Sequence, residues 1–249
     1  MTRTIQDLVL YEFAGKDPGL RFSPHCWKAR LALAHKGLEA ERLPWRLMEK
    51  DGIAFSGQGL VPVLVDQGKA ISDSWRIALH LEESYADRPS LFGSTAALPI
   101  CHFINNWADI TLGMAVIRVI LLDIYNCLHP ADQAYFRTSR EARFGMPLEA
   151  VVADQPARLA EVRKALQPLR HLLKEQDYIS GSSPSYVDYC VFGIFMWARC
   201  ASAVDLLEPQ DPVYAWRERL LDAFDGLARS APTYLSVHSA QGSSRISIS

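Results

Sequence analysis

A serine lies where an apolar, extended run gives way to a helical pattern, in the stretch Ser23-Pro24-His25-Cys26. A serine side chain at this place can accept a hydrogen bond from the first free N–H groups of a helix, and proline suits the first helical position. The hydroxyl could also act on an anion, because a helix N-terminus carries partial positive charge and exposed N–H donors. The stretch therefore predicts either a simple cap at Ser23 or a group that stabilises an anion there.

Two further pairs of residues lie at the start of predicted elements. Val61-Pro62 precedes a β-branched run, where a proline is typical of an edge strand. Asp73-Ser74 precedes a helical pattern, where an acidic residue is favourable even without a ligand. Taken alone, these pairs predict element boundaries rather than a site.

The composition is that of an ordinary globular protein. The chain has 249 residues, of which 49% are hydrophobic and 22% charged, with a formal net charge of −2. There is no basic surplus to neutralise phosphates, so we expect no nucleic-acid partner. The N-terminal sequence lacks a signal-peptide pattern and no apolar run reaches about 18 residues, so we expect a cytoplasmic protein without a membrane segment.

The cysteines are odd in number and lack the spacing of metal ligands, so we expect reduced thiols and no metal site. They are Cys26, Cys101, Cys127, Cys190 and Cys200.

The first third of the sequence alternates between strand and helix patterns. In chain order we expect a strand at 8–13, a helix at 24–35, a strand at 39–43, a hairpin at 61–72 and a helix at 73–85. Three glycines between 44 and 60 argue against a long regular element there. This order predicts a small mixed sheet with helices on its faces.

Strand patterns are absent beyond this point. We therefore expect a first domain at 1–86, a linker at 87–97, an all-helical domain at 98–237 and a flexible tail at 238–249. Helices are predicted at 101–122, at 158–175 with a kink at Pro168, and at 213–224. Ser185 and Asp188 have capping-box spacing before an apolar helix, which we expect to be central.

The order of these features resembles the glutathione transferase family over almost the whole chain. They are the strand followed by Ser-Pro and a helix, the Val-Pro before a hairpin, the stretch "ISDSW" and the capping box. "SPHCWKARLALAHKG" is most similar to the serine-type bacterial and fungal transferases related to the β-etherases. The resemblance implies a thioredoxin-like domain with a mixed four-stranded sheet, an all-helical domain, glutathione as co-substrate and a homodimer.

The resemblance also implies roles for particular residues. Ser23 would donate a hydrogen bond to the sulfur of glutathione, and Val61, turned by a cis Pro62, would pair with the cysteinyl backbone. Asp73 would meet the α-ammonium group, and Ser74 the γ-glutamyl carboxylate. Two departures stand out in the sequence: Asp73 is shorter than the glutamate of many relatives, and Leu60 replaces a polar residue of several relatives.

The remaining parts of the expected site are less defined. Lys50 and Gln58 are both candidates for holding the glycyl carboxylate of glutathione. A hydrophobic, aromatic small-molecule electrophile would lie between the domains. Candidate residues for that pocket are Tyr11, Phe103, Asn106, Trp107, Ile110 and Met114.

Three functions stay open on the sequence. The first is transfer of glutathione to the electrophile, with aryl ether cleavage as one form of that displacement. The second is a non-catalytic protein that binds glutathione and hydrophobic ligands. The third is a glutathione-dependent disulfide oxidoreductase using Cys26, although a lone second cysteine favours a packed helix residue.

Overall fold

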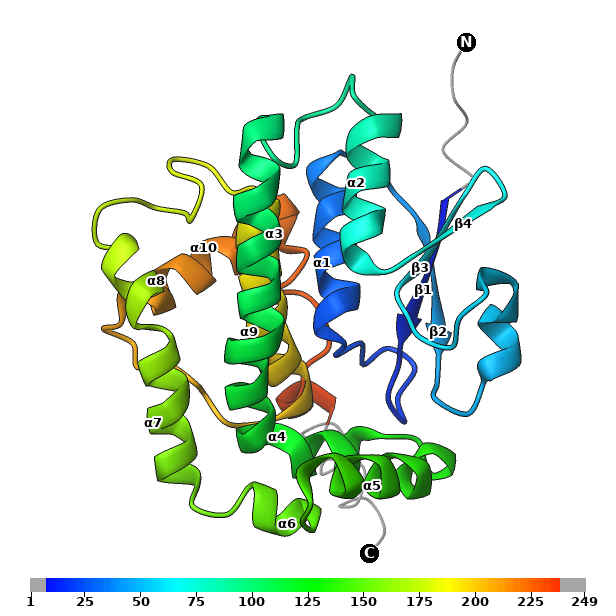
Figure 1. The fold of residues 1–249 in the computed structure, drawn as a ribbon, viewed down its shortest axis with the longest axis vertical. Coiled ribbons are helices and arrows are strands. Elements are labelled where there is room, and N and C mark those ends of the chain that lie inside the picture. The colour runs from blue at the N-terminus through cyan, green and yellow to red at the C-terminus, as the bar shows by residue number, and fades with distance from the viewer. Residues whose placement is uncertain (1–7, 238–249) are drawn as a thin grey trace, which may run out of the picture.

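The computed structural model describes residues 8–237 and places a four-stranded sheet beside a larger group of helices (Figure 1). The strands are β1 (Leu8–Phe13), β2 (Glu41–Trp45), β3 (Val63–Asp66) and β4 (Lys69–Ser72). Their order is β2-β1-β3-β4, with β1 parallel to β2 and antiparallel to β3, and β3 antiparallel to β4. The mixed four-stranded sheet expected from the sequence is confirmed.

Helix α1 runs from Pro24 to His35, the bounds that the sequence predicts. Ser23 caps its N-terminus, Pro24 occupies the first turn, and Gly37 follows its end with φ 64°. Most of its residues are buried, because the helix lies between the sheet and helix α9 (Tyr186–Ala201) (Figure 1). The position of its N-terminus is therefore set by packing on two sides.

The β3–β4 hairpin turns at Gln67 and Gly68, which have φ values of 51° and 79°. Two successive positive φ angles are typical of the type I′ turn that joins two-residue hairpins. Asp66 pairs with Lys69, so it is the last residue of strand β3 and lies outside the turn.

The rest of the first third differs from expectation in its bounds. Strand β2 begins two residues later than predicted, because the register places Trp45 opposite Phe13 and buries it against Ile53. The stretch 44–60, where the sequence argues against a long regular element, contains a short 3-10 helix, η1 (Lys50–Ser56). Helix α2 spans Ser74–Ser84 and begins after Asp73, which caps it.

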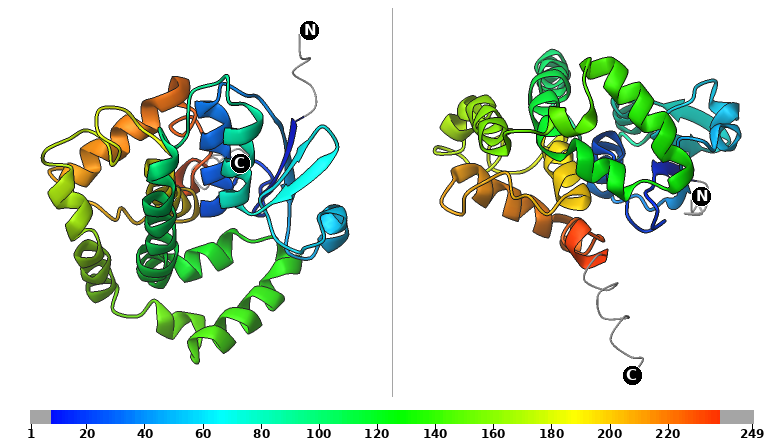
Figure 2. Two further views of the ribbon diagram at one scale, coloured as in Figure 1. Left: turned by 45° about the horizontal axis from the view of Figure 1, so that its top comes forward. Right: turned by 90° about the horizontal axis from the view of Figure 1, so that it is seen from below.

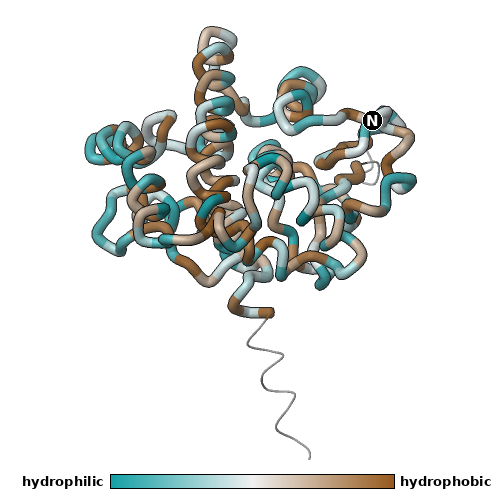
Figure 3. The backbone as a smooth tube through the Cα atoms, turned by 60° about the horizontal axis from the view of Figure 1, so that its bottom comes forward, coloured by the Kyte–Doolittle hydropathy of each residue, from teal (hydrophilic) through white to brown (hydrophobic). Residues whose placement is uncertain are grey.

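The second part of the chain is helical, as expected. Its elements are η2 (Thr95–Ala97), α3 (Leu98–Trp107), η3 (Ala108–Leu112), α4 (Gly113–Cys127), α5 (Pro130–Phe144), α6 (Leu148–Val151), α7 (Gln155–Ala165), α8 (Gln167–Leu172), α9 and α10 (Pro212–Gly226). Helix α5 lies at the lower end of the molecule, near the N-terminal end of α1 (Figures 1 and 2). Brown and teal stretches alternate along many helices, the pattern of elements with one buried face (Figure 3).

Two predicted helices differ in the structure. The helix expected at 101–122 is longer and contains the π-helical turn η3 between α3 and α4. The helix expected at 158–175 is two helices, since Pro168 lies in the first turn of α8 and has no N–H to continue the pattern of α7. The tail at 238–249 lies outside the described residues.

Within residues 8–237, one continuous helical stretch, Thr95–Cys127, is long and apolar enough to cross a membrane by length and composition. Half of its most apolar window is buried inside the protein, and a core helix produces the same pattern. The stretch therefore does not by itself indicate a membrane segment.

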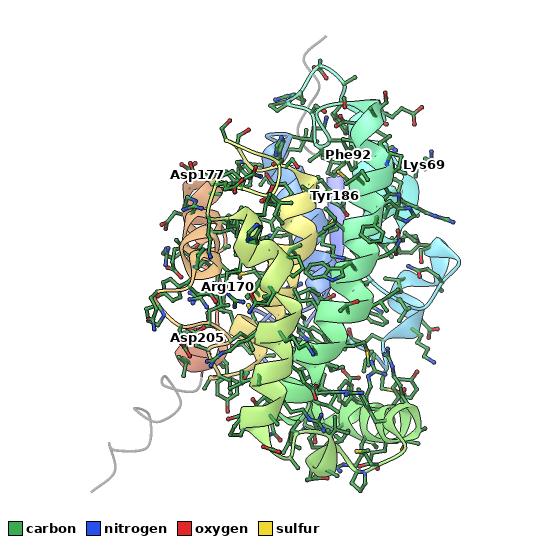
Figure 4. The ribbon with its side chains drawn as sticks, turned by 60° about the vertical axis from the view of Figure 1, so that its left-hand side comes forward. Lys69, Phe92, Arg170, Asp177, Tyr186 and Asp205 are labelled. Atoms are coloured by element: carbon green, nitrogen blue, oxygen red, sulfur yellow. The ribbon has the colours of Figure 1, made fainter. Side chains whose placement is uncertain are left out.

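Aromatic side chains join the sheet domain to the helices. Trp75 of α2 lies 5.5 Å from Phe92, measured between ring centroids. Phe92 in turn lies 5.4 Å from the ring of Tyr186 at the start of α9, and both residues are labelled in Figure 4. The Tyr186 hydroxyl donates to the carbonyl of Ser74 at 2.8 Å. These contacts hold the N-terminus of α2 against the helical part of the chain.

The capping box predicted before α9 forms part of a buried polar centre. The Asp188 carboxylate accepts hydrogen bonds from Ser185 N at 3.1 Å, Ile179 N at 2.8 Å and Trp216 Nε1 at 2.9 Å. Burial is the largest influence and raises the pKa of Asp188. The carboxylate therefore ties the start of α9 to α10 and to the preceding loop.

Candidate functional site

A cavity of about 550 Å³ lies between the sheet domain and the helices, next to the N-terminus of α1. Its walls are mainly apolar, and residues from both parts of the chain contribute. They are Phe13, Phe22, Ser23, Pro24, His25, Trp45, Leu47, Leu60, Val61, Asp109, Ile110, Gly113, Met114, Ile117, Ile124, Phe136, Arg140, Arg143, Ile194 and Trp197. A volume of this size is in the range of small-molecule sites.

Ser23 lies at the wall of this cavity with 9% of its surface exposed. Its Oγ accepts a hydrogen bond from Cys26 N at 3.3 Å, and its backbone is extended, with φ −65° and ψ 125°. The cap uses only an oxygen lone pair of Ser23, and the same hydroxyl also makes a side-chain hydrogen bond with Cys26, which, against the larger effect of burial, lowers the pKa of that thiol. Capping therefore leaves the O–H of Ser23 able to donate to a molecule in the cavity.

The Val61–Pro62 peptide bond is cis, as the resemblance implies. Val61 lines the same cavity as Ser23, and the Pro62 carbonyl accepts a hydrogen bond from Asp73 N at 3.3 Å. The loop before β3 is thus joined directly to the start of α2. Pro62, Asp73 and Ser74 do not themselves line the cavity, so the structure brings Ser23 and Val61 together and places the other three beside them.

Asp73 already has partners within its own helix. Its Oδ1 accepts hydrogen bonds from Trp75 N at 3.0 Å and Arg76 N at 3.1 Å, and its φ of 78° is unusual for a residue with a side chain. Ser74 is 2% exposed. Any ligand at this helix start would meet an exposed carboxylate and a buried hydroxyl.

The two candidates for the glycyl carboxylate lie outside the cavity wall. Gln58 Nε2 donates to the carbonyl of Leu60 at 2.6 Å, so this side chain braces its own loop. The ammonium of Lys50 lies 5.5 Å from the ring centroid of Tyr135 in α5. Leu60, one of the departures from the family pattern, lines the cavity with 65% of its surface exposed.

The charged groups beside Ser23 are largely paired. The buried Lys28 ammonium donates to Asp109 Oδ1 at 2.6 Å and to Asn105 Oδ1 at 2.8 Å. Desolvation first, and then the Lys28 ammonium, lower the pKa of His25, which is therefore neutral at pH 7. The charge of Asp109 is compensated by Lys28, and His25 adds no positive charge near Ser23.

Cys26 is buried within α1, and its Sγ accepts a hydrogen bond from Phe13 N at 3.5 Å. Burial is the main cause that raises the pKa of its thiol to about 12. Such a thiol is protonated at neutral pH and is a poor nucleophile. This geometry favours the packed helix residue over the disulfide-reductase alternative, and all five cysteines are free and buried.

The cavity lies where the sequence analysis expects an electrophile pocket, between the two parts of the chain, but its lining includes only some of the expected residues. Ile110 and Met114 line the cavity, whereas Tyr11, Phe103, Asn106 and Trp107 do not. Phe103 is 68% exposed. The π-helical turn η3 adds a residue to one helical turn, so the faces of α3 and α4 are offset and a single helical period over 103–114 fails.

Helix α5 contributes residues that the sequence analysis missed. Phe136, Arg140 and Arg143 line the end of the cavity formed by this helix, and Trp197 of α9 lines it as well. The signal that could have found them is the run "YFRTSREAR", where arginines recur every three residues on a helix. The run alone could not show that two of them face a cavity.

Family models match two regions of the chain. The model described as "Glutathione S-transferase, N-terminal domain" matches residues 22–84, and "Glutathione S-transferase, C-terminal domain" matches residues 100–221. Glutathione S-transferase Z1 of Arabidopsis thaliana is 38% identical over 69 residues, which cover 26% of this chain and 31% of that protein. The matched segment thus spans about a third of that relative.

Solved structures share the fold over nearly the whole chain. A glutathione S-transferase of Ceriporiopsis subvermispora, CsGST83044, crystallised in complex with glutathione, has a TM-score of 0.79 at 21% identity and covers 90% of this chain and 100% of its own. The β-etherase LigF from Sphingobium has a TM-score of 0.60 at 20% identity and covers 87% of this chain and 96% of its own. At these identities the likeness concerns the fold alone.

Proposed function

This chain belongs to the glutathione transferase family, and we propose that it activates the thiol of glutathione at Ser23 for attack on a hydrophobic, aromatic electrophile. The observation that carries the proposal is the Ser23 hydroxyl, placed at a helix N-terminus and at the wall of a cavity between the two parts of the chain.

The chemistry required of Ser23 is modest. A thiol with a pKa of about 8.5 is only a few per cent thiolate at neutral pH, and a tenfold gain needs about 1.4 kcal/mol of selective stabilisation of the anion. A hydrogen bond to a charged group is worth about 1.5–3 kcal/mol, and the helix N-terminus adds to it. Ser23 does not need to ionise, because the attacking atom belongs to glutathione.

The residues around Ser23 fit glutathione at several points. Val61, before strand β3, offers backbone groups to which an extended peptide can add in the manner of a strand. The start of α2 offers the carboxylate of Asp73 for an ammonium group, and Ser74 with the helix N-terminus for a carboxylate. We propose Ser23 as the catalytic residue and Val61, Pro62, Asp73 and Ser74 as the glutathione-binding residues.

The experiment on Ser23 must separate its two roles. Ser23→Ala removes both the cap and the donor, whereas Ser23→Asp keeps a capping oxygen but adds a negative charge and no donor at neutral pH. Thiolate absorbance of bound glutathione, followed against pH, should titrate at higher pH in both variants. We expect turnover at neutral pH to fall about 10- to 100-fold.

Two controls make this result specific. Ser23→Thr keeps both the cap and the hydroxyl and should titrate near the parent. Unfolding measurements should show Ser23→Asp to be more stable than Ser23→Ala. If the thiolate titrates at the same pH in the parent and Ser23→Ala, the proposed role of Ser23 is wrong.

A second function has its own support. Asp73 is engaged by two N–H groups of its own helix, and Leu60 offers an apolar side chain where several relatives are polar. These features would suit a protein that holds glutathione and hydrophobic ligands without useful chemistry. Retention on immobilised glutathione, together with no conjugation of aryl halides, would favour this alternative.

Three finer proposals depend on the same premise. The shared fold with a β-etherase suggests displacement at an aryl ether carbon as one form of the reaction. The exposed apolar side chains Ile100 and Phe103 of α3, 63% and 68% exposed, suggest a homodimer, which light scattering can test. A cytoplasmic location is proposed from the reduced cysteines.

A further inference from the structure

We propose that the electrophile is an aromatic compound carrying a carboxylate or similar oxyanion, which Arg140 and Arg143 bind at the end of the cavity formed by α5. This inference rests on the proposed function and names the class of substrate that the site selects.

The three arginines of this part of α5 have different surroundings. Arg137 pairs with Glu141 at 2.8 Å and with Glu149 at 2.9 Å. Arg140 and Arg143 line the cavity, and within residues 8–237 neither is paired with a carboxylate. Arg137 is thus neutralised by carboxylates of the protein, whereas Arg140 and Arg143 could be neutralised by an anionic ligand.

The bonds that these two arginines make are weak substitutes for an anion. Arg140 Nη1 donates to Ser139 Oγ at 3.0 Å, and Arg143 Nη2 donates to the thioether sulfur of Met114 at 3.2 Å. A thioether is a weak acceptor, and a guanidinium offers five N–H donors. Most of the donors of both groups are therefore available to a ligand.

The balance of charge in the cavity is positive. The acidic residue of its wall, Asp109, is held by Lys28 at 2.6 Å. Burial first, and then the charge of Arg143, lower the pKa of Arg140, as expected for like charges close together in a partly desolvated place. An oxyanion between the two guanidinium groups would relieve this repulsion and could be bound in bidentate fashion.

The remaining walls fit an aromatic body between the anion and the sulfur. Arg140 lies over the ring of Phe136, 4.8 Å from its centroid, and this contact restricts where the guanidinium can point. Phe136 and Trp45 line the same cavity as Ser23, so an aryl group bound there would contact apolar surface. The site would place the reacting carbon toward Ser23 and the oxyanion toward α5.

A matched pair of electrophiles tests this inference. In 4-chloro-3-nitrobenzoate and 4-chloro-3-nitrobenzamide, the thiolate of glutathione forms a bond to the ring carbon that bears chlorine, chloride leaves with the bonding pair, and the thiol proton passes to solvent. The two compounds differ in charge at the far end of the ring. Their enzymatic kcat/KM values are each divided by the uncatalysed rate constant, which removes the difference in intrinsic reactivity.

We expect the normalised kcat/KM of the parent protein to favour the benzoate by at least about 10-fold, the value of a charge-assisted hydrogen bond. Arg140→Gln and Arg143→Gln should each reduce this preference, and the double variant should bring the ratio close to one. Arg137→Gln is the matched control, from the same helix but outside the cavity, and should keep the parent ratio.

The outcomes are distinguishable. Conjugation of both compounds with no preference for the benzoate, or a preference that survives in the double variant, would overturn the inference and leave the proposed function intact. Failure to conjugate either compound, in a protein that still binds glutathione by calorimetry, would overturn the proposed function and the inference with it.

Discussion

Gly193 lies in α9 at the point where this helix crosses the N-terminal turn of α1. A Cβ atom added at Gly193 would lie 2.6 Å from the carbonyl oxygen of Pro24 and 3.3 Å from Cγ of Lys28. Contacts under 3.0 Å are essentially never observed, so Gly193→Ala requires α1 and α9 to separate by several tenths of an ångström. The atom in the way is main chain and cannot rotate aside.

The expected change in the free energy of unfolding of Gly193→Ala is the sum of two opposing effects. In an unhindered helix, alanine would be favoured over glycine by about 1 kcal/mol. Overpacking of a core contact costs about 1–3 kcal/mol, and here the obstacle is backbone, so we expect the upper half of that range to apply. The net result should be a loss of about 1–2 kcal/mol in the free energy of unfolding. For a chain of this size that corresponds to a fall in Tm of about 2–8 °C.

Gly193→Ala should also reduce activity, because the Pro24 carbonyl directly follows Ser23 in the chain. Thermal unfolding and glutathione-conjugating activity are measured on the same preparation. Gly59→Ala is the stability control, since no atom lies within 4 Å of a Cβ there, and its free energy of unfolding should stay within about 0.5 kcal/mol of the parent value. A Gly193→Ala protein as stable and as active as the parent would refute the close-packing argument.

Two further predictions concern buried ion pairs. Glu12→Gln should lower the free energy of unfolding in urea by about 3–5 kcal/mol, because the fully buried Glu12 carboxylate accepts from Arg30 at 2.9 and 2.7 Å and its loss leaves a buried guanidinium unpaired; a loss below about 1 kcal/mol would contradict this. For Asp211, burial would raise the pKa, but hydrogen bonds from Arg170 and from Val213 N, with the charge of Arg163, outweigh it and lower the pKa. A lowered carboxyl pKa stabilises the fold above the unfolded value of about 3.9 and loses that effect as pH falls through the folded value. Asp211→Asn should therefore cost about 1–3 kcal/mol at pH 7, and the difference from the parent should shrink at pH 3, whereas a constant difference would contradict the linkage.

The parts of the fold that the sequence predicts well depend on neighbouring residues. Ser23 with Pro24 sets the start of α1, and Gln67 with Gly68 allows the hairpin turn, because each signal acts within one turn of the chain. The family resemblance then supplies the arrangement of these elements, which local patterns do not contain. The bounds of the domains stay predictions, as do the roles of the glutathione-binding residues.

The parts that the sequence does not predict depend on packing between distant segments. The offset between the faces of α3 and α4 comes from the π-helical turn η3, which leaves no clear mark on the apolar pattern. Likewise, the sequence does not distinguish Arg137 from Arg140, because both are arginines of one regular three-residue series on the same helix. Only the fold shows that the first meets Glu149 and the second a cavity.

In the proposed reaction, the two parts of the chain have different roles: the first activates the thiol and the second selects the electrophile. Cys26, at the position of the second thiol in a dithiol motif, is buried and protonated, so the chain has no nucleophile of its own at the end of α1. The Ser23 hydroxyl, which caps α1, suits a thiolate that belongs to bound glutathione, because it can donate a hydrogen bond without reacting itself. Selection of the electrophile then falls to α5, whose arginines do not contact the cap of α1. The proposal therefore predicts that changes in α5 alter the choice of substrate without altering the pKa of a thiol bound at Ser23.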